Sequence, residues 1–452
     1  MAVGELGPSL IHRLTIDGVE ATVGGLEMEG LEGLRRTFRS GRTRGIDWRK
    51  SQLLALVKFL EENEAQILEA LEQDLGKHPV EAYRDEIGFV KKSAEHSLQN
   101  IKKWMAPKKG QLPLVLFPSR AEILPEPLGT VLIIGSWNFP CSLTLDPLIG
   151  AISAGNTVVI KPSELAPACS SLLCRTIPCY LDSEAIKIIE GGSDVGEQLL
   201  QHPWDKIFFT GSPRVGRIIM SAAAKHLTPV TLELGGKCPV ILDSFSDSDF
   251  KVAMKRIASG KWGSCAGQAC IGIDYVLVQK KFASLLDDRA DNFTGSSTRF
   301  QIMTEEIFGP LLPIITLDDI EESIDFINAR PKPLTIYAFT KNGKLKEQIL
   351  QETSSGSVLI NDTLIQFICD GLPFGGVGAS GFGRYHGKYS FDTFSHEKPV
   401  LHRTFFLELE ARHPPWNEFK MDFIRLAYKF DYIGLLFLLL GLRRMFTPNR
   451  SR

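Results

Sequence analysis

Two cysteines lie five residues apart in a glycine-rich turn, within residues 261–282, that leads into a β-branched, aromatic segment. A nucleophilic thiolate needs a low pKa, an approach path for substrate, and donors for the oxyanion that it creates. The neighbours of Cys270 are small and leave such a path, whereas Cys265 has no strong case. Free cysteine is also among the most buried residue types, so an ordinary structural role is the alternative for Cys270.

Two polar side chains elsewhere could assist such a nucleophile. Glu233, in "LELGGK", ends an apolar run, and a carboxylate at the end of a strand in a partly apolar cleft can act as a general base. Asn138, in "GSWNFP", could donate its amide N–H to a developing negative charge. A surface glutamate and a turn asparagine are the plainer interpretations of these two residues.

Two further stretches could contact a nucleotide. In "FTGSPRVG", Gly211 and Gly216 open a helix after a strand, which would present backbone N–H groups to phosphate, although the spacing is neither G-x-G-x-x-G nor a P-loop. In "KPSE", Lys161 and Glu164 could bind ribose hydroxyls, or they could form a solvated helix cap.

The elements that must position these residues follow a regular period. Helical spacing of apolar residues extends from Leu31 to Leu98. Short β-branched runs then begin near residues 130, 157, 185, 206 and 230, with helix-like segments between them. This is the βαβ period of a parallel, doubly wound sheet, in which ligands lie outside the carboxyl ends of the strands. Four more runs predict strands of a second α/β region: "DYVLVQ", "LLPIITL", "TIYAFT" and "GSVLIN".

The overall totals favour a soluble globular protein of two or three domains, since the chain has 452 residues, 44% hydrophobic and 23% charged. A formal net charge of -2 gives no electrostatic case for nucleic acid. The eight cysteines are irregularly spaced, so we expect no disulfide framework, no metal site and a reducing compartment. The first 45 residues lack the features of a signal or transit peptide.

Together and in this order, the motifs closely resemble the aldehyde dehydrogenase superfamily, and specifically its class 3 branch, including plant members. The similarity extends from about Leu31 to about Trp416. "LELGGK" and the cysteine of "GQAC" are its most specific marks. The other matching stretches are "SWNFP", "AGNTVVIKPSE", "KIFFTGSPRVGRIIM", "EEIFGP", "TSSGSVLIND" and "LPFGGVGASGFGRYHGKYSFDTFSHEK".

This resemblance implies a covalent oxidation of aldehydes to carboxylic acids. Cys270 matches the family's nucleophile, Glu233 its general base, and Asn138 the amide of its oxyanion hole. The implied cofactor is NAD, because a carboxylate at Glu164 repels a 2′-phosphate, and class 3 enzymes also tolerate NADP. The residues that the resemblance places around the cofactor are Ser136, Trp137, Lys161, Glu164, Gly211, Ser212, Gly216, Glu306 and Phe308.

The resemblance also implies an α/β fold with a Rossmann-like cofactor domain, a second α/β catalytic domain and a small bridging β element of a homodimer. The expected divisions are an N-terminal extension at 1–30, a cofactor domain at 31–111 and 128–235, a catalytic domain at 236–397, a bridging element at 112–127 and 398–412, and a tail at 413–452. In the bridging element, residues 112–127 would pair with the segment near 398–409 and complete a dimer across sheet edges.

The catalytic domain departs from the family between residues 283 and 302. Relatives carry several dozen more residues there, whereas this chain has a short polar bridge. A loss of that size would remove packing partners from the strand after Cys270 and part of the substrate wall, exposing apolar surface. A weakly active or non-catalytic, cofactor-binding subunit is therefore the second interpretation. A third, a papain-type hydrolase, would need an activating histidine such as His386 or His396.

The tail raises a separate question about membranes. Its apolar residues Phe419, Phe423, Leu426, Phe430 and Ile433 recur at helical spacing with basic residues between them, and an apolar run follows at residues 432–442. That run is too short to span a bilayer. We expect either a helix packed over the body or an interfacial anchor, which would attach a cytoplasmic protein to the cytosolic face of an internal membrane such as the endoplasmic reticulum. Medium- to long-chain aliphatic or aromatic aldehydes are the expected substrates.

Overall fold

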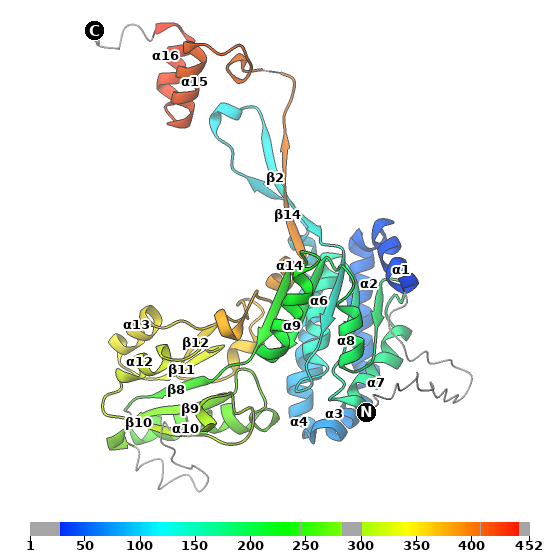
Figure 1. Ribbon diagram of the computed structural model, residues 1–452, viewed down its shortest axis with the longest axis vertical. Helices are drawn as coiled ribbons and strands as arrows, with labels where there is room; N and C mark the ends of the chain where they lie inside the picture. Colours follow the sequence, from blue (N-terminus) through cyan, green and yellow to red (C-terminus); the bar gives the residue numbers. More distant parts are fainter. Residues whose placement is uncertain (1–27, 245, 283–300, 407, 443–452) are drawn as a thin grey trace, which may run out of the picture.

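The computed structural model describes residues 28–244, 246–282, 301–406 and 408–442. Its strands form sheets of six, five and three strands. Figure 1 shows two α/β bodies side by side, with a narrow arm rising from them and two helices at the far end of the arm. The predicted extension at 1–30 and the polar bridge at 283–302 lie almost wholly outside the described residues.

The six-stranded sheet contains all five strands of the first predicted series. In order across the sheet, β7, β6, β3, β4 and β5 are parallel, and the short β13 lies antiparallel to β7. Their bounds are β3 (Thr130–Ile134), β4 (Thr157–Lys161), β5 (Ile186–Ile188), β6 (Lys206–Gly211), β7 (Val230–Leu234) and β13 (Gly381–Phe382). Every residue of β3 and β4 is buried, as expected for a parallel sheet with helices on both faces.

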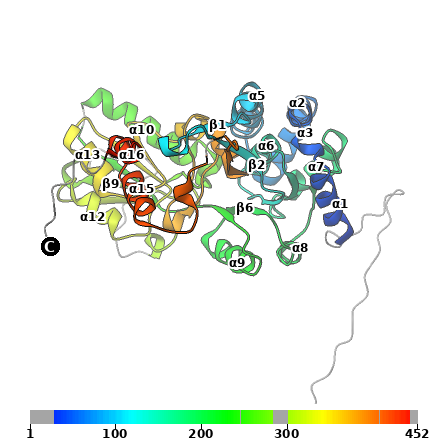
Figure 2. The same ribbon diagram turned by 90° about the horizontal axis from the view of Figure 1, so that it is seen from above.

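Helices cover both faces of this sheet, and Figure 2 shows α8 and α9 on one side with α5 and α6 on the other. One core cluster joins the sheet to α2 (Ile46–Glu62), α3 (Glu64–Leu75), α5 (Gly88–Trp104), α6 (Ser142–Ala154), α7 (Pro167–Thr176) and α14 (Lys388–Thr393). A second cluster joins it to α1 (Met28–Arg39), α8 (Ser193–Leu199) and α9 (Pro213–Ala224). The helical cover predicted for residues 31–98 is therefore present.

The five-stranded sheet is entirely parallel, in the order β10, β9, β8, β11, β12. Its strands are β8 (Cys238–Leu242), β9 (Ile273–Gln279), β10 (Ile314–Leu317), β11 (Thr335–Phe339) and β12 (Ser357–Ile360), and α10 (Asp247–Trp262), α12 (Glu322–Asn328) and α13 (Gly343–Glu352) pack against it. The sequence predicted all of these strands except β8. Pro239 obscured it, because proline is unusual in a central strand; here the register of β8 shifts between Cys238 and Pro239.

The strand that follows Cys270 keeps its partners, contrary to expectation. β9 pairs with β8 along one edge and with β10 along the other. Its residues 273–278 are all buried, and its side chains enter core clusters on both faces of the sheet. The prediction that the shortened chain would strip packing from this strand is therefore wrong for β9, because β10 takes the adjacent position directly.

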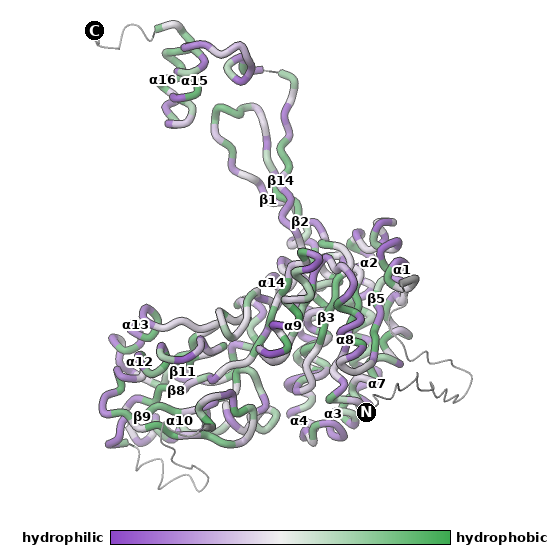
Figure 3. The backbone as a smooth tube through the Cα atoms, in the orientation of Figure 1, coloured by the Kyte–Doolittle hydropathy of each residue, from purple (hydrophilic) through white to green (hydrophobic). Residues whose placement is uncertain are grey.

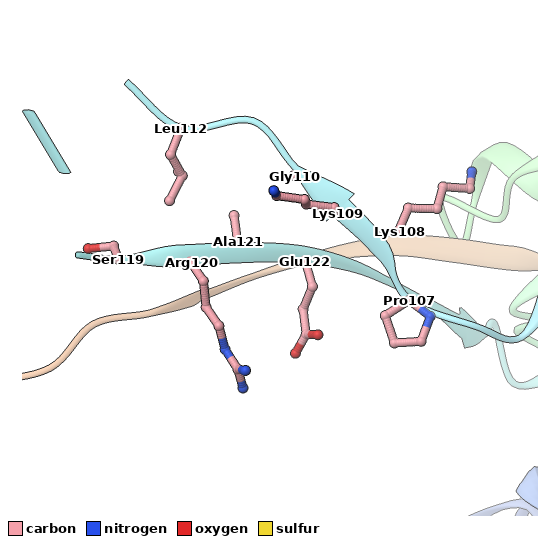
Figure 4. A pocket seen from close by; sticks show the side chains of 9 residues that line it. All are labelled: Pro107, Lys108, Lys109, Gly110, Leu112, Ser119, Arg120, Ala121 and Glu122. Carbon is pink, nitrogen blue, oxygen red and sulfur yellow. The ribbon is translucent and has the colours of Figure 1, made fainter. Parts of the chain in front are cut away.

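The arm is a three-stranded antiparallel sheet of β1 (Lys108–Gly110), β2 (Arg120–Pro127) and β14 (Ser395–His402). The pairing runs from Ser395 opposite Pro127 to His402 opposite Arg120, so the expected pairing of these two segments is present and begins before residue 398. An open hollow of about 550 Å³ lies between β1 and β2, where Figure 4 shows Leu112 and Ala121 turned toward each other. Cys270 is not among the residues that line this hollow.

The tail forms two helices, α15 (Glu418–Tyr428) and α16 (Tyr432–Leu439), at the end of the arm. The helical spacing suggested one longer helix, but the chain breaks at Phe430, whose φ of 55° is incompatible with a helix. Figure 3 shows the hydrophobic residues of α16 at the end of the arm, far from the two α/β bodies. No helix of the described residues combines the length and the apolar character needed to cross a membrane.

Candidate active site

Cys270 lies in the turn that joins α10 to β9. This turn passes through left-handed conformations at Ala266 (φ 49°) and Gly267 (φ 86°), and a side chain on Gly267 would come within 2.5 Å of the Gly309 carbonyl oxygen. The Cys270 side chain is half-buried and packs against the core. Burial, and then the carboxylates of Glu306 and Glu233, raise the pKa of its thiol to about 12, so the thiol is protonated at neutral pH in the nucleotide-free protein.

Glu233 and Asn138 come from the six-stranded sheet and approach this turn. Glu233 is buried on β7, and burial raises its pKa well above the usual range. Neither of its carboxylate oxygens has a hydrogen-bond partner among the described residues, which leaves both available to a ligand or water. Asn138 Nδ2 donates to the Gln268 carbonyl oxygen at 2.8 Å, within the cysteine turn. The structure therefore brings together the three residues that the sequence singled out for chemistry.

Cys265 has a structural place in the same turn. Its buried Sγ donates to the Asn138 carbonyl oxygen at 3.4 Å and to Gln268 Oε1 at 3.6 Å. Its backbone N–H donates to Glu81 Oε1 at 2.5 Å. These contacts tie the cysteine turn to the Asn138 loop, which explains why Cys265 is a small buried residue beside the candidate nucleophile.

Charged residues near the start of α5 support both loops, and sequence reasoning missed them. Glu86 is fully buried, pairs with Lys77 at 2.6 Å, and accepts the N–H groups of Cys141 and Ser142 at 3.1 and 2.7 Å. These N–H groups belong to the first turn of α6, directly after the Asn138 loop. Asp85 Oδ2, next to Glu86, accepts from Ser264 Oγ at 2.6 Å. In the sequence, such charges cannot be distinguished from those of a solvated helix face.

The candidate cofactor residues follow the carboxyl ends of neighbouring strands. Ser136 and Trp137 come after β3, Lys161 ends β4, and Gly211 ends β6. Because β6, β3 and β4 are adjacent and parallel, these ends meet at one edge of the sheet. Lys161 Nζ pairs with Glu164 Oε2 at 2.7 Å; partial burial opposes ionisation of Glu164, but this ammonium group holds its pKa below the usual value.

The start of α9 lies at the same edge. Ser212 is its N-cap, and the Ser212 Oγ accepts the N–H of Val215 at 3.4 Å. Gly216 is buried on the inner face of α9, where an added Cβ would come within 3.2 Å of the Leu234 side chain. The helix N-terminus therefore directs N–H groups toward the carboxyl edge of the sheet, as a phosphate-binding helix would.

Glu306 and Phe308 come from the five-stranded body and face this edge. Glu306 lies against Gly235, where an added Cβ would come within 2.2 Å of its Oε2 atom. Burial raises the pKa of Glu306 to about 8, although the Gly236 N–H donates to the carboxylate and opposes the rise. The ring of Phe308 meets that of Trp137 edge-to-face, with centroids 5.6 Å apart. The predicted cofactor residues thus converge from both bodies.

The two histidines of the hydrolase alternative lie elsewhere. His386 is buried among aromatic rings, and its Nε2 lies 3.7 Å from Asp146 Oδ2. Its ring nitrogens have no hydrogen-bond partner in the described part of the chain, and burial lowers its pKa to about 3. His396 is exposed on β14 of the arm. No thiol contact therefore supports a papain-type arrangement among the described residues.

The family model described as "Aldehyde dehydrogenase family" matches residues 34–294 and, in a second piece, residues 291–400. The "Aldehyde dehydrogenase family 3 member F1" of Arabidopsis thaliana is 52% identical, over 92% of this chain and 98% of that protein. This chain belongs to the aldehyde dehydrogenase family.

Solved aldehyde dehydrogenases share the fold. The substrate-bound AldH of Staphylococcus aureus is 39% identical and matches with a TM-score of 0.82, over 90% of this chain and 99% of that chain. The aldehyde dehydrogenase of Bacillus cereus, solved as an NAD+ complex, matches with a TM-score of 0.73 at 23% identity, over 82% and 88% of the two chains. Proteins of this fold have been solved with NAD and with NADP.

The comparisons also show where this aldehyde dehydrogenase is shorter than its relatives. The match to the Arabidopsis relative runs over 475 residues, more than the 452 of this chain, so the relative has residues that this chain lacks. The two pieces of the family match meet at residues 291–294, inside the predicted polar bridge. A segment present in the family is therefore missing between β9 and β10.

Proposed function

We propose that this aldehyde dehydrogenase converts medium- to long-chain aliphatic or aromatic aldehydes to carboxylic acids through a thioester on Cys270. The observation that carries the proposal is the convergence of three side chains from two sheets: Cys270, Glu233 and Asn138. The substrate class rests on the class 3 relatives and on the apolar tail.

The proposed chemistry needs each of these side chains in turn. Glu233 takes the thiol proton of Cys270 and passes it to solvent, and Cys270 Sγ attacks the aldehyde carbon. The oxygen that becomes negative accepts the N–H groups of the Asn138 amide and the Cys270 backbone. Glu306 and Phe308 would hold the nicotinamide end of a bound cofactor, which would supply the acceptor for the hydride of this carbon. Glu233 then takes a proton from water, which attacks the thioester and releases the acid and the thiol. A buried carboxylate without a hydrogen-bond partner suits the last step, since its pKa lies above the usual range.

The residues at the sheet edge fit a dinucleotide. Lys161 and Glu164 would bind the adenosine ribose, the Ser212 turn at the start of α9 the pyrophosphate, and Glu306 with Phe308 the nicotinamide ribose. The Glu164 carboxylate stands beside Lys161 and is half exposed, where it would repel a 2′-phosphate. We therefore infer a preference for NAD over NADP.

A direct assay tests the enzyme proposal. The purified chain is incubated with hexanal and either NAD or NADP, beside a Cys270→Ala variant, and NADH or NADPH formation is followed. We expect turnover by the wild type, a higher kcat/KM with NAD, and loss of at least about 10³-fold in the variant, because the covalent step has no nucleophile. Equal background rates in both proteins would favour the non-catalytic subunit, and full activity of the variant would contradict the thioester mechanism.

The arm supports the proposed homodimer. β14 is an edge strand of eight residues, and its residues are largely exposed on a sheet that stands away from both bodies. An unpaired edge of this length is a template for pairing with another chain. Sedimentation equilibrium measures the proposed dimer directly, and a monomer at micromolar concentration would contradict it.

The end of the arm supports the proposed membrane contact of a cytoplasmic enzyme. Val115, in the connection between β1 and β2, packs with Phe423, Leu435 and Leu438 of the tail helices. This connection and the tail therefore form one unit. Large apolar side chains are exposed around it: Leu114, Phe117, Phe405, Phe406, Trp416, Phe419, Tyr428, Phe430, Ile433, Leu436, Leu439 and Leu440. Exposed apolar surface of this extent marks a protein or membrane contact.

Removing the tail tests this contact. We expect the full chain to co-sediment with anionic lipid vesicles and the variant lacking residues 417–452 to remain in the supernatant, because the deletion removes most of the exposed apolar helix surface. Vesicle sedimentation at matched protein concentration measures the difference, with cell fractionation as a second readout. An unchanged distribution after deletion would contradict the membrane proposal.

A further inference from the structure

A buried ion pair lies between the two sheets, outside the residues that carry the proposed chemistry. Lys237 follows Gly235 and Gly236 directly and precedes β8, while Asp274 is the second residue of β9. Their side chains are 11% and 3% exposed, and Lys237 Nζ contacts Asp274 Oδ2. Burying two charges is costly unless their remaining donors and acceptors are also satisfied.

Among the described residues, the other side-chain hydrogen bonds of this pair go to one short segment. Lys237 Nζ donates to the carbonyl oxygens of Ile302 and Glu305, at 3.1 and 2.8 Å. Asp274 Oδ1 accepts the N–H of Ile307 at 2.8 Å. The ammonium group thus uses three partners, its full donor capacity, and the pair binds both ends of residues 302–307.

This segment carries Glu306, and contacts of its carboxylate and of the first residues of the segment also hold it. The Gly236 N–H donates to the Glu306 carboxylate, and the carboxylate occupies the space that a side chain on Gly235 would need. At the start of the segment, Ile302 and Met303 pack with Tyr275. The described chain resumes at residue 301, near the end of the polar bridge and directly before the segment.

We propose that Lys237 and Asp274 act as a positioning pair that fixes residues 302–307, so that Glu306 and Phe308 stand at the cofactor side of the site. This inference rests on the proposed function, which assigns those two residues to the nicotinamide ribose. The pair thus holds the residues that, in relatives, follow the segment missing from this chain. Neither residue touches the reacting atoms, so neither is a catalytic residue.

The proposal predicts a split between two properties of the site. Cofactor affinity depends on the segment that the pair holds, whereas the Cys270 turn is fixed from the other side by Glu81, Asp85 and Asn138. Loss of the pair should therefore weaken NAD binding without displacing the Cys270 turn. Because the Glu306 carboxylate contributes to the raised pKa of the Cys270 thiol, its displacement should also speed alkylation. A general loss of structure would change the circular dichroism spectrum as well.

The test uses the full chain in the variants Lys237→Met and Asp274→Asn. NAD binding is titrated by tryptophan fluorescence, and Cys270 alkylation by iodoacetamide is followed by mass spectrometry at fixed pH. We expect Kd for NAD to rise about tenfold or more, since small displacements of a positioning group have large effects. The alkylation rate should rise, because a displaced Glu306 carboxylate no longer raises the pKa of the Cys270 thiol, while the circular dichroism spectrum stays that of the wild type. Lys280→Met, which removes the exposed Lys280–Asp318 pair of the same sheet, is the matched control and should leave both values unchanged.

The outcomes separate the inference from the function on which it rests. NAD affinity within twofold of the wild type in both pair variants would overturn the positioning role. If Lys237→Met does not fold, as judged by circular dichroism, Asp274→Asn decides alone, because it keeps the side-chain shape and the oxygen that accepts from Ile307. A wild-type chain that does not bind NAD would overturn the proposed cofactor site itself, and the pair's role with it.

Discussion

The two large sheets of this aldehyde dehydrogenase both have buried central strands, although a segment found in relatives is missing from the chain that forms the second sheet. The six-stranded sheet takes β3 to β7 from one uninterrupted stretch, residues 130–234. The five-stranded sheet lacks a segment that its relatives have between β9 and β10, yet these strands pair directly and every residue of β9 but the last is buried. In this chain, β9 and β10 are therefore neighbours without that segment.

The two sheets differ more in what they contribute to the site. The six-stranded sheet carries the proposed base and the proposed oxyanion donor, and the five-stranded sheet carries the candidate thiol and Glu306. Activity therefore depends on how the second sheet is held against the first, and each prediction below tests one part of that arrangement.

The largest effect on activity is expected where the two sheets meet, from Glu233→Gln. Turnover should fall by about 10²–10⁴-fold, because the amide cannot accept the proton of the attacking water. In the nucleotide-free protein the same variant should alkylate faster at Cys270, since the Glu233 carboxylate contributes to the raised pKa of that thiol. Steady-state kinetics and mass spectrometry measure the two effects, with Asp318→Asn as a control at an exposed carboxylate away from the site.

The pH dependence of alkylation tests the same junction. A thiol whose pKa is about 12 ionises further with each rise in pH, so the wild-type rate should increase about tenfold per pH unit from pH 7 to 10. The Glu233→Gln variant should reach each alkylation rate at a lower pH than the wild type, because its thiol has the lower pKa. A plateau below pH 9 in the wild type would show that the free thiol is already activated, contrary to its environment in this structure.

A smaller effect compares the sheets directly, through Leu132→Ala in β3 and Leu277→Ala in β9. Both side chains are fully buried in central strands, so each truncation should lower the free energy of unfolding by about 2–5 kcal/mol. Urea denaturation, followed by circular dichroism, measures both. A cost below about 1 kcal/mol for Leu277→Ala alone would mean that the shortened sheet is loosely packed.

The smallest effect is expected from Lys280→Met, at the outer end of β9. Its partner Asp318 is largely exposed, as is Lys280 itself, and solvent screens such pairs. The urea midpoint should stay within experimental error at low and high salt. A clear loss of stability would indicate that the ends of β9 and β10 depend on this contact, and that the missing segment had stabilised them.

The strands could be predicted from the sequence, and the candidate site residues could be proposed from it, because their signals are local. β-branched runs at a regular period gave nine of the strands of the two large sheets, and motif order identified Cys270, Glu233 and Asn138. The strand β8 could not be predicted because Pro239 disguised it, and the break at Phe430 carried no glycine to mark it. The roles of Glu86 and Lys237 were hidden for a different reason: burial of a charge depends on partners distant in sequence.

One core cluster contains residues of both large sheets, among them Val131 and Ile133 of β3 with Val240 of β8 and Val276 of β9. Parting the two bodies would expose this shared apolar surface to water, at about 25 cal/mol for each Å². Separation of the two bodies is therefore unfavourable, so the shared core holds the Cys270 turn against the six-stranded sheet.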